Sequence, residues 1–394
     1  MILNKFIFPL VTLVLLSSVV SCREHIDVQK ANAALDERLD NSATDTDGDG
    51  VVQGFAKVSV GTYNSCAIYF GALYCWGSNN FGGVGDGTTT PVSTPVKVID
   101  EGVTDVSVGF AHVCAVVDGG LFCWGDDTDG QVGDNACGSI IEPCEIISSG
   151  VKKVSAGLSN TCAVLDTGAL KCWGANGSGQ IGDNSTTPTS TPTEVIASGV
   201  SDVSTGSATT CAVVRGALYC WGDNSVGQYG NNTTVDSLIP LKTISHSVRS
   251  VSVSILNSMT CVKTSTSGLN CFGDNSSYQI GDGTTDLHIT PYRLFTANVT
   301  SVSATAAPCV AVDGSLRCWG PSSHVDVEDN LPTKIVASGV ASISTGEYHS
   351  CYVTTSLTLF CYGHNTNSLD GGLLGTGTEN AVFAEFPVQI FIPN

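Results

Sequence analysis

Charged side chains are scarce in this sequence, and basic ones are the scarcest. Charged residues make up 13% of the 394 residues, with 16 Lys and Arg against 36 Asp and Glu, and the net charge is −20. Soluble domains usually carry about 25% charged residues. The basic residues are scattered and form no cluster, and the negative surface would repel phosphates. The composition therefore argues against a nucleic-acid partner, and Gly, Ser, Thr and Asn supply the polar surface.

After residues 1–21 the sequence contains no apolar run long enough to span a membrane. Within that segment Lys5 supplies a positive start, and Phe6 to Leu16 form an apolar core too short for an ordinary membrane span. The segment ends in Val19-Val20-Ser21-Cys22, which resembles the signal of bacterial lipoproteins. The resemblance implies cleavage before Cys22 and a lipid anchor on Cys22. We expect the protein in the bacterial cell envelope, at the outer membrane in preference to the inner membrane, which is the alternative. The alternative is an ordinary secretory signal with a stray cysteine.

Cysteine, in contrast, is abundant, and its spacing predicts the fold. Fourteen of the 17 cysteines form pairs whose members lie nine or ten residues apart. The pairs recur roughly every 42 to 50 residues, a period typical of propeller blades. We therefore expect an all-β, seven-bladed β-propeller over residues 56–394. The pairs are Cys66 with Cys75, Cys114 with Cys123, Cys162 with Cys172, Cys211 with Cys220, Cys261 with Cys271, Cys309 with Cys318, and Cys351 with Cys361.

The spacing within each pair predicts one hairpin disulfide per blade. In Cys66 to Cys75, two apolar runs flank Phe70-Gly71, so that the cysteines face each other across a two-residue turn. Residues opposed in this way have the separation that a disulfide needs, and export supplies the oxidising compartment. Reduced thiols or metal sites are the alternative, but no pair has the gap of a zinc knuckle. Cys137 and Cys144 are expected to form an eighth bridge.

Each repeat carries further positions that recur within this one sequence. A Val-Ser strand precedes the first cysteine, a Leu stands two residues before the second, and a Pro leads a last short strand. These positions make about four strands per unit. An aromatic residue and a Gly follow each second cysteine, which indicates packing between blades and a turn. The aromatic residues are Trp76, Trp124, Trp173, Trp221, Phe272, Trp319 and Tyr362.

The run from Cys211 to Gly230, with Cys-Ala-Val, Gly-Ala-Leu-Tyr-Cys-Trp-Gly and Gly-Gln-Tyr-Gly, resembles the regulator of chromosome condensation repeat. The same pattern extends over nearly all of residues 56 to 394. The resemblance implies a seven-bladed propeller closed by a strand shared between the two termini. A related propeller, beta-lactamase inhibitor protein II, is built for binding another protein.

Residues 22–55 are polar and acidic, and we expect them to be a tether between the lipid and the propeller. The tether contains Asp45, Asp47 and Asp49, spaced like the opening half of a calcium loop. The twelfth position of such a loop would be Ala56, which cannot close it as a bidentate ligand. A solvated acidic linker is the favoured interpretation, with calcium as the alternative.

No catalytic set emerges from the sequence. His112 and His349 stand two residues before a blade cysteine, where other repeats have Asn64 and Asn160, so the position is expected to be structural. Phosphate loops and nucleophile motifs are missing. We therefore expect no enzyme activity and no cofactor.

The favoured function is a monomeric, lipid-anchored module that binds a protein. Irregular loops at 136–146, 322–330 and 365–375 are expected to emerge on one side of the ring. Asp326, Glu328 and Asp329 would give this side an acidic edge that suits a basic partner. The alternative is that these surface loops tolerate substitutions and have changed without gaining a function. A glycan-binding propeller with one pocket per blade, and a propeller lyase, are the alternative functions.

Overall fold

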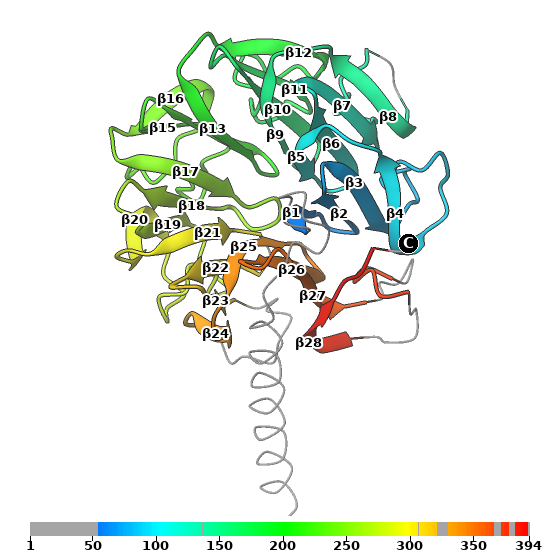
Figure 1. The fold of residues 1–394 in the computed structure, drawn as a ribbon. Helices are drawn as coiled ribbons and strands as arrows, with labels where there is room; N and C mark the ends of the chain where they lie inside the picture. Colours follow the sequence, from blue (N-terminus) through cyan, green and yellow to red (C-terminus); the bar gives the residue numbers. More distant parts are fainter. Residues whose placement is uncertain are drawn as a thin grey trace, which may run out of the picture. The chain divides into compact units, whose positions relative to one another are not determined.

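The structure is a computed structural model that describes residues 54–135, 138–305, 307–320, 330–365, 372–377 and 383–392. In this part of the chain every regular element is a strand, and the strands form seven four-stranded antiparallel sheets. The sheets are arranged around a common centre (Figure 1). The predicted all-β, seven-bladed propeller is therefore confirmed.

Each blade uses four consecutive strands, and we number the blades in chain order. The innermost strands are β1 (Phe55–Val60), β5 (Val103–Val108), β9 (Val151–Ala156), β13 (Val200–Thr205), β17 (Val248–Val253), β21 (Val299–Ser303) and β25 (Val340–Thr345). The second strands are β2 (Asn64–Tyr69), β6 (His112–Val117), β10 (Asn160–Leu165), β14 (Thr209–Val214), β18 (Met259–Thr264), β22 (Cys309–Val312) and β26 (His349–Thr354).

The third and fourth strands complete each sheet towards the outside of the ring. The third strands are β3 (Ala72–Gly77), β7 (Gly120–Gly125), β11 (Leu170–Gly174), β15 (Ala217–Gly222), β19 (Leu269–Gly273), β23 (Ser315–Cys318) and β27 (Leu359–His364). The outermost strands are β4 (Val92–Ile99), β8 (Ile140–Ile147), β12 (Thr189–Ile196), β16 (Ser237–Ile244), β20 (His288–Phe295), β24 (Thr333–Val336) and β28 (Phe383–Gln389).

The chain divides into two compact units, residues 1–42 and 43–394, and every described residue belongs to the second. The predicted signal peptide and almost all of the predicted tether therefore lie outside the described residues. The first strand begins at Phe55, one residue before the expected start of the propeller. Within the described residues, no helix has the length and hydropathy required to cross a membrane.

All seven predicted hairpin disulfides are formed. Their cysteines are directly opposed on the second and third strands of each blade, with Cα atoms 4.1 Å apart. The confirmed bridges join Cys66 to Cys75, Cys114 to Cys123, Cys162 to Cys172, Cys211 to Cys220, Cys261 to Cys271, Cys309 to Cys318, and Cys351 to Cys361.

The length of each hairpin turn sets the spacing of its two cysteines. The first blade turns through Phe70-Gly71, where both residues have positive φ as the predicted two-residue turn requires. In the third blade the three-residue turn ends at Gly168, whose N–H donates to Leu165 O at 2.8 Å. The sequence separation is accordingly 9 residues in the first blade and 10 in the third.

A ring of serine side chains joins the blades around the centre. Each serine hydroxyl accepts a hydrogen bond from a main-chain N–H of the next blade, as Ser59 does from Val108 at 3.0 Å. Ser344 of the last blade accepts from Val60 of the first at 2.9 Å, which closes the ring. These bonds satisfy donors on edges that have no sheet partner. The other members are Ser107, Ser155, Ser204, Ser252 and Ser303.

The predicted aromatic packing between blades is also present. The tryptophan after each second cysteine is buried, and its indole N–H donates to a main-chain carbonyl in the long loop of the preceding blade. Trp124, for example, donates to Gly83 O at 3.1 Å. A Cβ on Gly85 would lie 2.5 Å from the indole nitrogen of Trp124, and one on Gly133 would lie 2.5 Å from that of Trp173. The last glycine of the Gly-Gln-x-Gly-Asp pattern is therefore required by the indole of the next blade.

The expectation that the termini share a strand is wrong. All four strands of the first blade come from the N-terminal segment, and β28 completes the last blade with β25, β26 and β27. The ring closes through side chains instead. Phe55 and Val58 of the first blade share a buried cluster with Val353 and Ile390 of the last, and the Ser344 bond lies at the same seam. Because side chains make this joint, no sheet has to combine the two chain ends.

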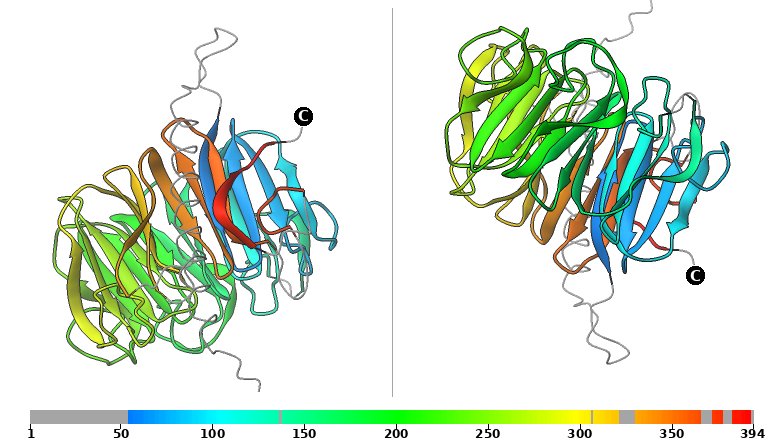
Figure 2. Two further views of the ribbon diagram at one scale, coloured as in Figure 1. Left: turned by 90° about the horizontal axis from the view of Figure 1, so that it is seen from below. Right: turned by 90° about the horizontal axis from the view of Figure 1, so that it is seen from above.

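The strands run between two opposite faces, where the loops gather (Figure 2). The turn face carries the hairpin turns, such as Phe70-Gly71, and it is where the described chain enters, with Phe55 N–H donating to Leu357 O at 2.7 Å. The loop face carries the short loops that follow the innermost strands and the long loops before the outermost strands. Of the irregular segments predicted to share one side of the ring, residues 136–137, 322–329 and 366–371 lie outside the described residues, and most of the rest of the first segment belongs to β8.

The two predicted structural histidines join neighbouring blades. His112 lies with its Nε2 2.9 Å from the hydroxyl of Thr161, which itself donates to Gln131 O at 2.7 Å. Because that hydroxyl uses its proton on Gln131, Nε2 of His112 carries a proton and donates it. His349 contacts Ser65 at 2.6 Å in the same way. Asn160 holds the equivalent position in the third blade, and its amide donates to Thr210 at 3.3 Å.

We expect that replacing Cys211 and Cys220 by Ser will lower stability without abolishing the ring. Each disulfide closes a loop of about ten residues, for which the chain-entropy model gives roughly 2.5 to 3 kcal/mol. The bridge joins two strands of one blade and does not join blades. The measurement is the denaturant midpoint together with the circular dichroism spectrum of strands. Loss of the folded spectrum in this variant would contradict the expectation.

We expect His112→Asn to weaken the acid sensitivity of the fold. Burial lowers the pKa of His112 to about 4, from 6.5 in an exposed chain. As the pH falls through 6.5 the unfolded chain takes up a proton, whereas the folded chain does so only near 4, so stability is lost across this window. The loss attributable to His112 is on the order of 3 kcal/mol. Unfolding of both proteins at pH 7 and pH 4.5 measures it, and His246→Asn at an exposed histidine is the control. Equal acid sensitivity in all three proteins would contradict the assignment.

Candidate binding surface

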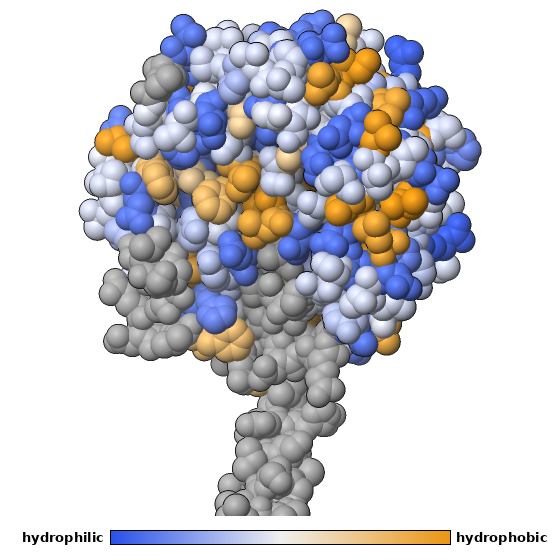
Figure 3. Space-filling model, turned by 180° about the vertical axis from the view of Figure 1, so that it is seen from behind, coloured by the Kyte–Doolittle hydropathy of each residue, from blue (hydrophilic) through white to orange (hydrophobic). Residues whose placement is uncertain are grey.

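The face of the ring shown in Figure 3 is mostly polar. On the side turned away from the viewer in Figure 1, hydrophobic residues lie in separate small patches among hydrophilic ones (Figure 3). A candidate site must therefore be found from specific contacts and cannot be found from one broad apolar area. The loop face provides such contacts next to the centre of the ring.

The innermost strands approach one another closely where they reach the loop face. A Cβ on Gly61 would lie 2.3 Å from Gly109 O, and a Cβ on Gly109 would lie 2.4 Å from Gly157 O. The residue after two of these glycines is bonded to the next blade, since Phe110 N–H donates to Gly157 O at 3.1 Å and Leu158 N–H donates to Gly206 O at 3.2 Å. Backbones packed this tightly leave no room between the blades for the side chains of the residues after these glycines. We infer that those side chains extend onto the loop face.

Five aromatic rings make a continuous row on this face, which we call the aromatic row. It comprises Phe110, Tyr63, Tyr348, His364 and Phe383, from the second, first and seventh blades. Successive ring centroids are 5.2, 6.0, 6.4 and 5.0 Å apart. The first three rings are half-buried, whereas His364 and Phe383 are exposed. Exposed rings held against one another in this way form a rigid surface with little side-chain entropy to lose on binding.

A shallow hollow lies beside the inner end of the row. Tyr63 and Phe110 line it together with Phe81, Asn80 and Ser78 from the long loop of the first blade. Phe81 is 45% exposed, which is unusual for a side chain of its size. The hollow therefore adds a further large ring and polar groups that can hydrogen-bond to a ligand at the same place.

The row also carries a negative charge. Glu347 stands next to Tyr348 in the loop after β25. Burial raises the pKa of both Tyr63 and Tyr348, and the carboxylate of Glu347 raises each pKa further. Aromatic faces and a carboxylate both attract cations. The chemistry of the surface therefore favours a positively charged side chain over an anion.

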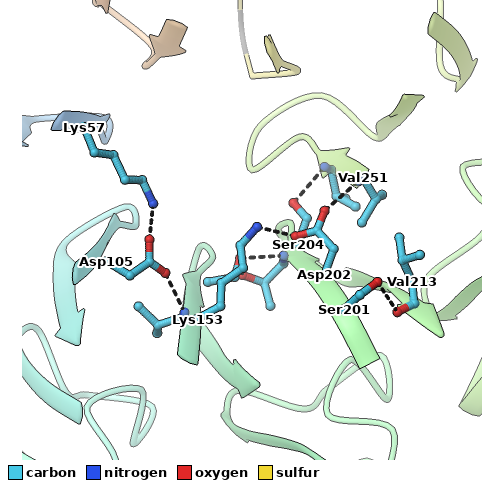
Figure 4. A network of polar contacts seen from close by, with 12 residues as sticks. Lys57, Asp105, Lys153, Ser201, Asp202, Ser204, Val213 and Val251 are labelled. Carbon is cyan, nitrogen blue, oxygen red and sulfur yellow. Dashed lines mark hydrogen bonds and ion pairs between the residues drawn. The ribbon is translucent and has the colours of Figure 1, made fainter. Parts of the chain in front are cut away.

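The wall around the centre carries charges of both signs that neutralise each other. Lys57 and Lys153 form ion pairs with Asp105 and Asp202 of the next blades (Figure 4). The second oxygen of each aspartate accepts a main-chain N–H from the blade after it, Val154 for Asp105 and Val251 for Asp202, both at 2.9 Å. These carboxylates are fully engaged in joining blades, so they are not available as a general acid or base.

Several predicted site residues lie outside the described residues. They are Cys22, Asp45, Asp47, Asp49, Cys137, Asp326, Glu328 and Asp329. The lipid site, the tether calcium site and the acidic edge therefore stay predictions. Cys144 lies on β8 as a free cysteine, and the predicted bridge to Cys137 stays untested because Cys137 is not described. Across the described ranges, no group of three His, Cys, Asp or Glu side chains converges on one point.

The sequence interpretation missed the aromatic row. It concentrated on the aromatic residues after the second cysteines, which are buried between blades. The available signal was different, because Tyr63, Phe110 and Tyr348 each stand one or two residues after the glycine that ends an innermost strand. Only the pairing of the chain ends across the first and seventh blades brings the three together.

Comparison with known proteins gives the family of the repeats. Two models of the regulator of chromosome condensation (RCC1) repeat match the sequence, one at residues 71–116 and 118–164 and the other at residues 103–131 and 151–180. No curated protein matches the chain by sequence.

Solved structures show the same fold. Human WBSCR16 superposes with a TM-score of 0.68 at 18% identity, covering 82% of this chain and 94% of that protein. Yeast RCC1 (Prp20), solved bound to Kap60, has a TM-score of 0.68 at 19% identity and covers 86% and 84%. Prp20p from Saccharomyces cerevisiae, described with its binding properties to Gsp1p and histones, has a TM-score of 0.68 at 18% identity and covers 86% and 87%. Residues 71–180 therefore match the RCC1 repeat, and the chain has the fold of these solved propellers.

Proposed function

We propose that the protein is a lipid-anchored module of the bacterial cell envelope that binds a basic protein through the aromatic row of its loop face. The observation that carries this proposal is the unbroken contact of five rings across three blades. Large, rigid aromatic side chains are the residues that most often dominate the energy of protein interfaces. The row combines them with the hollow beside Tyr63 and Phe110.

Charge supports a basic partner. Glu347 lies beside two rings of the row, and the chain carries a net charge of −20. The predicted acidic edge at Asp326, Glu328 and Asp329 belongs to the sixth repeat, which directly precedes the seventh in the chain. An acidic, aromatic surface would attract a basic protein at long range and hold a Lys or Arg side chain over the rings.

The position of the row suits an anchored protein. The described chain enters the ring at the turn face, where Phe55 contacts Leu357, whereas the row lies at the opposite ends of the innermost strands. The seven disulfides support the oxidising location that this proposal needs.

Protein partners are also described for structural neighbours. Yeast RCC1 (Prp20) was solved bound to Kap60, and Prp20p is described with its binding to Gsp1p and histones. At identities of 18 to 19% these partners do not transfer to this chain. They support only the use of such a ring as a surface for binding proteins.

The two alternative functions gain less support. A glycan site in every blade would need the recurring aromatic residues at the surface, but Trp76 and its equivalents are buried between blades. A lyase would need reactive carboxylates at the centre, whereas Asp105 and Asp202 are each paired with a lysine.

We expect the double variant Tyr63→Ala and Tyr348→Ala to lose its partner. The measurement is a quantitative pull-down from envelope extract, followed by a titration of the identified protein at increasing salt. Removing two rings from the centre of the row should weaken binding at least a hundredfold, since central aromatic residues of interfaces each contribute about 2 kcal/mol or more. Tyr292→Ala, at an exposed tyrosine on β20 of the fifth blade, is the matched control. Unchanged affinity in the double variant would place the binding surface elsewhere.

We expect Cys22→Ser to release the protein from the membrane or to block its processing. The lipid on Cys22 would be the anchor, because the apolar segment before it is removed on cleavage. Fractionation of cells, with metabolic labelling by a palmitate analogue, measures the change. A wild-type protein found in the soluble fraction without label would rule out the anchor.

A further inference from the structure

A buried asparagine organises the long loop of most blades. Asn79, Asn176 and Asn275 stand three residues after the Trp or Phe of their blades. In each, Oδ1 accepts a main-chain N–H five residues on, at 2.9 to 3.0 Å. The amide nitrogen donates to an aspartate seven residues on, at 3.1 to 3.2 Å, and to a carbonyl nine residues on. The amide nitrogen thus occupies a small space surrounded by oxygen atoms.

The second blade has an aspartate at this position. Asp127 replaces the asparagine that five other blades carry. Its Oδ1 accepts the N–H of Val132 at 2.7 Å, as the asparagines do with their own loops. Its Oδ2 therefore takes the place of the amide nitrogen. Asp127 is 0% exposed, and Oδ2 has no hydrogen-bond partner.

The neighbour of Oδ2 is itself a carboxylate. Asp134 stands seven residues after Asp127, where Asp86, Asp183 and Asp282 receive the amide in the other blades. Burial raises the pKa of Asp127 to about 6. The charge of Asp134 raises this pKa further, as does the hydrogen bond that the two carboxyl groups share when one of them is protonated, whereas the main-chain bonds from Val132 and Gly133 oppose the shift. A buried anion beside a second anion is costly unless a positive group lies between them.

We propose that Asp127 and Asp134 bind a divalent cation, Ca²⁺, in the space that the amide nitrogen occupies in the neighbouring repeats. The replacement of Asn by Asp changes the donor atom of the side chain into an acceptor and keeps the shape of the side chain. Two carboxylates therefore face this space in the second blade, where the other blades have one carboxylate and one amide. Calcium prefers oxygen ligands at about 2.3 to 2.6 Å and tolerates irregular geometry, unlike magnesium. The cation would secure the long loop of the second blade, whose Gly133 packs against Trp173 of the third.

Nearby groups agree with a hard cation. Cys144 on β8 lies close enough that the charges of Asp134 and Asp127, after burial, raise the pKa of its thiol. A protonated thiol is a poor ligand for calcium and does not compete with the oxygens. The site is separate from the predicted calcium loop at Asp45, Asp47 and Asp49 of the tether. It also does not depend on the proposed partner or on the lipid anchor.

The test uses the full chain in detergent at pH 7.5, stripped with EDTA. Every sample carries Asp45→Asn and Asp47→Asn, which remove the possible calcium ligands of the tether, so that only the propeller can bind calcium. Calcium chloride at 5 mM should raise the Tm by about 2 to 4 °C, since extracellular calcium sites bind at about 0.1 to 1 mM. Isothermal titration should show one site, with magnesium at least tenfold weaker.

The decisive variant is Asp127→Asn, which restores the residue of the other repeats. It should lose the calcium-dependent shift in Tm while folding at least as stably as the stripped parent. Asp183→Asn is the matched control, because it alters the aspartate position of the same loop in the third blade, where Asn176 supplies an amide. This control should keep the full shift.

Three results would overturn the proposal. In the first, the parent shows no response to calcium, and in the second, Asp127→Asn responds as strongly as the parent. In the third, the stripped parent loses stability as the pH rises from 4 to 7, Asp127→Asn does not, and calcium restores nothing. That result would mean that the two carboxylates share a proton only, because a raised pKa stabilises the folded state at low pH and ceases to do so above it.

Discussion

The hydrogen bond from a main-chain N–H to the serine of the preceding blade holds the ring together. Seven such bonds join seven innermost strands, including the bond from Val60 to Ser344 that links the two ends of the chain. An innermost strand has a sheet partner on one side only. Its other edge would otherwise present unpaired donors. The serine hydroxyl satisfies them with a short side chain, which keeps the blades close and lets each blade complete its own sheet.

This close approach determines what happens at the loop face. The indole of each tryptophan binds the long loop of the blade before it, and a glycine in that loop lies against the ring. The loops are therefore held from both sides, by their own blade and by the next. A face built in this way can present aromatic side chains in fixed positions. The aromatic row crosses the seam between the first and seventh blades, where the chain ends meet.

Because the same sequence pattern recurs in every blade, a residue that differs in one blade is informative. The fold assigns the same environment to one position in every blade, so a change of one atom can be interpreted against its equivalents. The side chains of Asn79 and Asp127 have the same shape, and the Oδ1 of each accepts a hydrogen bond from the N–H five residues on in its own loop. They differ in whether the second atom donates or accepts, and in one blade this leaves a buried oxygen without a partner. The scaffold tolerates the change because the bond to Oδ1 is kept.

The sequence alone determined the number of blades, the number of strands in each blade and the hairpin disulfides, because these depend on local spacing. Cys66 and Cys75 must face each other once Phe70-Gly71 turns, whatever the rest of the chain does. It also correctly predicted that Trp124 packs between blades, since an aromatic residue recurs at that position in every repeat. For His112 it predicted a structural position, and the contact with Thr161 of the next blade came from the structure. Only the tertiary structure decided how the ring closes and which side chains share a surface. Tyr63 and Tyr348 are 285 residues apart in the chain, and they meet because Ser344 binds Val60, a contact that no local pattern encodes.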